Sequence, residues 1–183
     1  MAVAKSWKGV LAHFNRAPEG VRACFIYLPA LLEGFPLDVS LSYVFAQVEL
    51  AHNLSLYCGV VKQHRANAVL ARRAIDTQHL TREGFRERFG VVFGQPVPET
   101  ISEKLASAED TRDRVMHGKS TSAKQKREAI GNVVEYAREY NDFVYSIARL
   151  RPFGELRGFK GRAKSVDPST TRWMLKGMGF TVS

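Results

Sequence analysis

The sequence has little cysteine and no long apolar run. Its only cysteines, Cys24 and Cys58, lie far apart and outside any Cys-x-x-Cys pair. This excludes a disulfide framework and a zinc knuckle, and it predicts buried thiols in a reducing, cytoplasmic compartment. The longest apolar run, residues 23–32, is interrupted by Pro29 and is shorter than the roughly 18 residues of a membrane-spanning helix. We therefore expect no membrane partner.

The sequence also lacks the alternation of apolar and polar residues that marks β-strands, and it has no internal repeat. Apolar residues recur at helical spacing instead, which predicts an all-α fold. A chain of 183 residues can bury one sizeable core without disulfides or metals. Ser120 or Thr121 is the expected cap of the last long helix. The expected helices cover residues 6–15, 20–33, 37–75, 81–89, 99–116, from the cap to 149, and 171–176.

Positive charge is in excess. The chain has 27 Lys and Arg against 18 Asp and Glu, a net charge of +9, and this favours a polyanionic partner such as RNA. Residues 151–183 alone hold seven basic and two acidic residues. We therefore divide the chain into a helical domain, 1–150, and a basic, glycine-containing C-terminal extension, 151–183. Four apolar residues of the extension are expected to dock on the bundle or on a partner: Trp173, Met174, Met178 and Phe180.

The most specific feature is the stretch from Arg112 to Gly118, which contains Arg112, Asp113 and His117. On one continuous helix, an Arg and a His five residues apart lie roughly 140° apart around the axis. A turn at residues 116–118 would let His117 swing back beside Arg112. A polar pair, a helix end and a new helix thus coincide at one place. In the simpler alternative, Arg112 and Asp113 are surface charges and His117 only ends its helix.

This pattern resembles the HEPN superfamily (higher eukaryotes and prokaryotes nucleotide-binding), whose signature is an Arg, often a polar residue after it, and a His four to six residues on. Arg112, Asp113 and His117 match the signature, and the resemblance extends loosely over residues 37–150. It implies a bundle of four or five helices that forms a homodimer with the motifs facing each other. It also implies a metal-independent endoribonuclease of a toxin–antitoxin or anti-phage system, with an antitoxin or defence protein as partner.

In such a site, His117 would move protons between the RNA 2′-hydroxyl and the leaving 5′-oxygen, while Arg112 would stabilise the phosphate. Asp113 would orient one of the two. No metal and no cofactor is expected. Two alternatives stay open: a catalytically silent HEPN-like module that binds nucleic acid or nucleotides, and a plain helical interaction protein. The residues expected to bind RNA are Arg114, Lys119, Arg157, Lys160, Arg162 and Lys164.

Two other patterns carry less weight. Glu49 and His52 have the Glu-x-x-His spacing of a di-iron ligand pair, but such sites need a second copy on another helix, and the sequence has none. A role in the core or in solvent is therefore expected for both. Residues 118–120 read Gly-Lys-Ser, like the end of a phosphate-binding loop, but the first glycine of that motif is missing.

Overall fold

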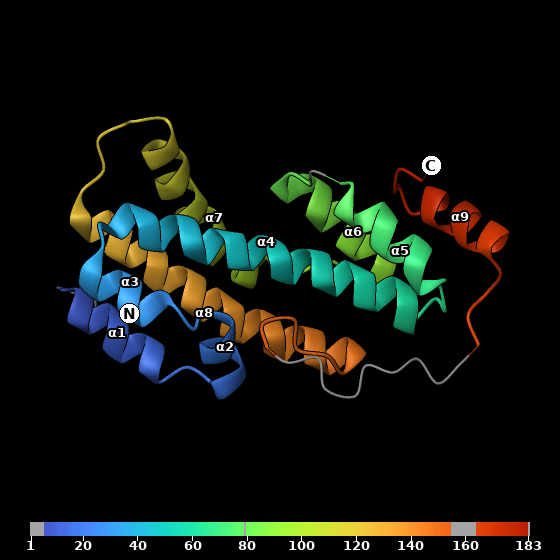
Figure 1. Cartoon of the computed structure of the whole chain (residues 1–183), viewed down its shortest axis with the longest axis horizontal. Coiled ribbons are helices and arrows are strands. Elements are labelled where there is room, and N and C mark those ends of the chain that lie inside the picture. The colour runs from blue at the N-terminus through green and yellow to red at the C-terminus, as the bar shows by residue number, and fades with distance from the viewer. Residues whose placement is uncertain (1–5, 79, 155–163, 183) are drawn as a thin grey trace. The chain divides into compact units, whose positions relative to one another are not determined.

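The computed structural model describes residues 6–78, 80–154 and 164–182 (Figure 1). Over these ranges the chain forms nine α-helices and no strand, which confirms the all-α class, although the apolar spacing predicts only seven helices. None of the described helices is both long and apolar enough to cross a membrane. The helices are α1 (Trp7–Asn15), α2 (Glu19–Cys24), α3 (Leu28–Gly34), α4 (Leu37–Lys62), α5 (Ala68–Asp76), α6 (Arg82–Phe93), α7 (Glu99–Met116), α8 (Ala123–Ala148) and α9 (Pro168–Gly177).

Contacts group the chain into two units. Unit 1 comprises Met1–Glu49, Pro98–Phe143 and Phe153–Glu155. Unit 2 comprises Leu50–Val97, Val144–Pro152 and Leu156–Ser183. The long helices α4 and α8 each contribute residues to both units.

The core of unit 1 is built around Phe153, which is fully buried. Its ring lies 5.8 Å from that of Phe25, and it meets Tyr136 and Tyr140 edge-on at centroid distances of 6.1 and 6.0 Å. The buried side chain of Asn141 accepts a hydrogen bond from the Phe153 N–H at 2.8 Å and donates one to its carbonyl at 2.7 Å. One amide thus satisfies both backbone groups of a residue outside any helix.

The prediction of one helix over residues 20–33 is wrong, because residues 25–27 form a turn that separates α2 from α3. Pro29 lies in the first turn of α3. It has no N–H with which to continue a helix from the preceding turn, whereas a proline is tolerated at a helix start. The hydroxyl of Tyr43 on α4 bridges the break. It donates to the Cys24 carbonyl and accepts from the Tyr27 N–H, both at 3.3 Å.

The prediction of a single helix over residues 37–75 is also wrong, because α4 ends at Lys62 and α5 begins at Ala68. Between them Arg65 adopts a left-handed conformation with φ of 58°, and the Asn67 side chain caps α5. The Arg65 guanidinium donates to the Lys164 carbonyl at 2.6 and 3.0 Å, and its own carbonyl accepts from the Val166 N–H. The partners in these bonds are about a hundred residues apart in the chain. The spacing of apolar residues therefore cannot predict them.

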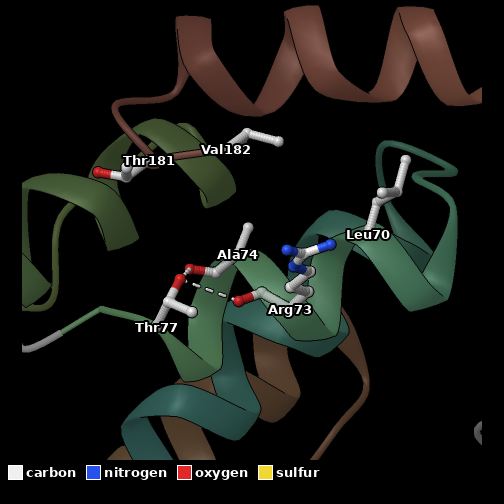
Figure 2. Close-up of a pocket in the computed structure, with 6 residues that line it drawn as sticks. All are labelled: Leu70, Arg73, Ala74, Thr77, Thr181 and Val182. Carbon is white, nitrogen blue, oxygen red and sulfur yellow. Dashed lines mark hydrogen bonds between the residues drawn. The ribbon is translucent and has the colours of Figure 1, made fainter.

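In unit 2, α9 packs on α5. The Asn67 N–H donates to the Thr171 hydroxyl at 3.0 Å, and Thr171, Leu175 and Phe180 are buried. Figure 2 shows Thr181 and Val182 over the face of α5 that carries Ala74 and Thr77. The small pocket that these residues line with Leu70 and Arg73 has room for about one water molecule.

The expected docking of four apolar residues in this segment is met only in part. Phe180 is buried, and Met174 and Met178 are half-buried. Trp173 points outward with 80% of its surface exposed. The segment 164–182 is therefore part of the packing of unit 2, and its indole is left on the outside.

Both cysteines are free thiols, and the expected burial is complete only for Cys58. Cys58 is buried and Cys24 is half-buried. Burial raises the pKa of Cys58 to about 12 and that of Cys24 to about 11. Because the thiolate is the reactive form, neither residue has the environment of a nucleophile.

His52 on α4 is a packing residue. Its ring stacks on Phe85 of α6 with centroids 3.7 Å apart and planes within 3° of parallel. Desolvation lowers the pKa of His52 to about 3, because an apolar environment disfavours the charged imidazolium. Of the two roles expected for this residue, in the core or in solvent, its position agrees with the first.

Replacing Asn141 with Ala should lower the free energy of unfolding by roughly 3 kcal/mol, since the N–H and carbonyl of Phe153 would be buried without partners. Denaturant unfolding measures the change. Asn132→Ala is the matched control, because Asn132 is half-buried on the same helix and does not take part in this clamp. Equal losses in the two variants would contradict the role assigned to Asn141.

His52 should make stability depend on pH below neutrality. Its pKa falls from 6.5 to about 3 on folding, so between these values the unfolded chain binds a proton that the folded chain does not. Stability should therefore fall as the pH is lowered, by at most about 1.4 kcal/mol per pH unit. Unfolding is measured from pH 8 to 4 for wild type and His52→Phe. The difference between their free energies of unfolding should be constant above pH 7 and change below it. A difference that stays constant to pH 4 would contradict this origin.

Candidate functional site

The motif residues lie at the exposed C-terminal end of α7 and in the turn that follows it. Asp113, Arg114 and residues 116–120 are exposed, and Arg112 is half-exposed. In Figure 1 the final turn of α7 projects away from α4 and α8. A polymer or a second protein chain can reach these side chains without any rearrangement of the core.

Backbone hydrogen bonds determine where α7 ends. Gly118 is left-handed with φ of 65°, its N–H donates to the Val115 carbonyl, and the Lys119 N–H donates to the Arg114 carbonyl at 2.8 Å. This is a Schellman motif, which pairs carbonyls that a helix end leaves open. Glycine suits the left-handed position because it has no Cβ.

The cap of α8 is Ser122, so the expected cap at Ser120 or Thr121 is wrong by one or two residues. The Gln125 N–H donates to the Ser122 hydroxyl, and the Gln125 side chain accepts from the Ser122 N–H. This reciprocal pair is a capping box, which neither Ser120 nor Thr121 can form because Ala123 and Lys124 stand three residues on. Ser120 and Thr121 instead belong to the turn, where the Ser120 carbonyl accepts from Arg114 at 3.0 Å.

Arg112 and Asp113 are brought together. The guanidinium of Arg112 donates to one carboxylate oxygen of Asp113 at 2.9 and 2.7 Å. Its central carbon also lies 4.9 Å from the ring centre of Phe45 on α4, a cation–π geometry. Two contacts of different kinds thus fix the orientation of a side chain that is 39% exposed. Phe45 has no sequence signal that connects it to a residue 67 positions away.

Arg112 and His117 are not brought together within one chain. The His117 N–H still donates to the Asp113 carbonyl at 3.0 Å, so His117 follows the course of the helix and the chain turns only at Gly118. Roughly 140° of helix rotation therefore separates the two side chains. Among the described residues, no hydrogen bond joins them, and the expected swing of His117 toward Arg112 does not occur.

The residues expected to bind RNA fall into both units. Arg114 and Lys119 are exposed beside the motif in unit 1. Lys164 is exposed in unit 2. Arg157, Lys160 and Arg162 lie outside the described residues.

Another charged cluster of unit 1 links α7 and α8. Arg138 pairs with Glu135 and Glu139, and Lys104 pairs with Glu139. The hydrogen bond from Arg138 holds the pKa of Glu135 below its usual range. Across the described ranges, no three His, Cys, Asp or Glu side chains gather closely enough to hold a metal ion.

Comparison with protein-family models, with curated proteins and with solved structures found no match to this chain.

Proposed function

We propose that this protein is a metal-independent endoribonuclease of HEPN type that acts as a homodimer. The observation that supports it best is the presentation of the motif. Arg112, Asp113 and His117 lie on one exposed helix end between two long helices, and Arg112 is held in place by Asp113 and Phe45. The toxin–antitoxin or anti-phage setting, with its partner protein, is proposed from the family resemblance alone.

The chemistry follows from these side chains. A neutral imidazole of His117 removes the proton from the 2′-hydroxyl, and the 2′-oxygen attacks the adjacent phosphorus. Arg112 binds the phosphate oxygens and stabilises the additional negative charge of the transition state. The bond from phosphorus to the 5′-oxygen breaks, and a protonated imidazole gives that oxygen a proton. The products are a 2′,3′-cyclic phosphate and a 5′-hydroxyl. Asp113 acts as a positioning residue for Arg112, its hydrogen-bonded partner.

The geometry within one chain favours a dimeric site. Base and acid need two imidazoles, and each chain offers one His at the motif. A two-fold axis near the ends of two α7 helices would bring both copies of Arg112 and His117 to one phosphate. Met116, which directly precedes His117, is 67% exposed and offers an apolar contact for such an interface.

Purified protein should cleave single-stranded RNA in the presence of EDTA and leave 2′,3′-cyclic phosphate ends. His117→Ala should reduce the cleavage rate by about 10²–10⁴-fold, because an acid–base group is lost, and should leave RNA affinity nearly unchanged. Arg112→Ala should reduce both rate and affinity, since the guanidinium contacts the phosphate before and during reaction. Thr100→Ala, an exposed change at the other end of α7, is the matched control.

Normal cleavage by His117→Ala would contradict this assignment. RNA binding without cleavage by the wild type would favour the silent module. Cleavage that needs magnesium would exclude the metal-free route, and equal cleavage of DNA would exclude attack by the 2′-hydroxyl.

The dimeric site predicts a specific mixing behaviour. When wild-type and His117→Ala chains exchange, a mixed dimer has one imidazole and should be inactive. Cleavage per wild-type chain should therefore fall to about one half at equal amounts and to about one quarter at threefold excess of the variant. Sedimentation under the same conditions verifies that the species is a dimer. Cleavage per wild-type chain that does not change with added variant would contradict a shared site.

A further inference from the structure

The positive charge of this protein is concentrated in one unit. Unit 2 contains 15 Lys and Arg against 4 Asp and Glu, a net charge of +11, whereas unit 1 contains 12 against 14, a net charge of −2. The motif at Arg112 lies in the unit without excess positive charge. Attraction for a polyanion therefore comes from unit 2.

The outward face of α9 is the most unusual surface of that unit. Arg172, Trp173 and Lys176 are exposed, and their spacing places them on one side of the helix. Trp173, at 80%, is the most exposed large apolar side chain among the described residues. The opposite face of α9, with Thr171 and Leu175, is buried. The helix is therefore anchored, and its indole points outward on the same side of the helix as two cations.

The anchoring is independent of these three side chains. Arg65 bonds to the Lys164 carbonyl, Asn67 bonds to Thr171, and Arg88 donates to the Gly179 carbonyl at 3.0 Å. The carboxylate of Asp167 is engaged at the start of α9 by the N–H and hydroxyl groups of Ser169 and Thr170. It therefore caps the helix rather than neutralising Arg172 or Lys176.

We infer that this face of α9 binds single-stranded nucleic acid, with a base stacked on Trp173 and phosphates paired with Arg172 and Lys176. An exposed aromatic ring flanked by cations is the chemistry that single-strand-binding proteins use. A protein partner fits less well, because lysine is depleted at protein interfaces and Trp173 is the only large apolar side chain exposed on α9. A membrane fits less well too, because an interfacial helix needs a continuous apolar face, and here one apolar residue stands among polar ones.

A second aromatic group of unit 2 does not offer the same platform. The ring of Tyr145 has Arg151 at 4.0 Å and Arg149 at 5.3 Å from its centre, and it is only 39% exposed. Guanidinium groups already occupy the space that a base would need. Trp173 is thus the residue whose removal tests the inference.

Fluorescence provides a direct test, because the chain has two tryptophans and Trp7→Phe leaves Trp173 as the only one. This variant is titrated with oligo(U) and oligo(dT) of about 12 nucleotides. Stacking should quench the fluorescence in a saturable manner with both probes. In the otherwise native chain, Trp173→Ala should weaken binding roughly tenfold. Lys176→Ala should weaken it less and flatten the dependence of log affinity on log salt by about 0.7.

Val69→Ala is the matched control, because Val69 is 76% exposed on α5 of the same unit and should bind like the wild type. Absence of quenching, or wild-type affinity in Trp173→Ala, would overturn the inference. A change of oligomeric state in that variant at unchanged affinity would also overturn it and would indicate a contact between chains.

The inference does not depend on the cleavage chemistry, because oligo(dT) has no 2′-hydroxyl to attack and still presents bases and phosphates. A protein that binds through Trp173 without cleaving RNA would overturn only the proposed function. A protein that cleaves RNA while Trp173→Ala binds normally would overturn only this inference.

Discussion

Every helix end leaves backbone N–H or carbonyl groups without partners inside the helix, and a chain that is helical over its described residues must satisfy all of them in turns. This requirement determines where the helices of this protein begin and end. Ser6, Asn67, Thr81 and Asp167 cap helices with their side chains, and Gly94 ends α6 in a left-handed conformation. The side chain of Asn141 likewise forms hydrogen bonds with the N–H and carbonyl of Phe153, which would otherwise be buried without partners.

The candidate site depends on the same requirement. The Schellman turn at Gly118 and the capping box at Ser122 together hold the segment between α7 and α8. His117 stays on the helical course because its N–H remains bonded to Asp113. A chain that turned one residue earlier would bring the imidazole toward Arg112 of the same protomer. The local hydrogen bonds thus shape the chemistry that we propose.

The division of charge gives the two units different physical characters. Unit 1 carries the motif and has a net charge near zero, whereas unit 2 carries the excess of Lys and Arg. In proteins that act on nucleic acids, non-specific affinity comes from phosphate contacts, and rate comes from a few positioned groups. If unit 2 supplies the affinity for nucleic acid and the end of α7 supplies the groups that cleave it, affinity and cleavage rate can change independently.

Much of this arrangement follows from the sequence alone. The long helices α7 and α8, the break at Gly118 and the candidate residues Arg112, Asp113 and His117 are recognisable because helical spacing, capping residues and glycine act over a few neighbouring residues. Four features were decided by tertiary structure: the break at residues 63–67, the contact of Arg112 with Phe45, the burial of Phe153 and the outward position of Trp173. Each depends on contacts between residues far apart in the chain, or on which face of a helix finds a neighbour. Such contacts have no local period, so spacing predicts the helices but not their partners.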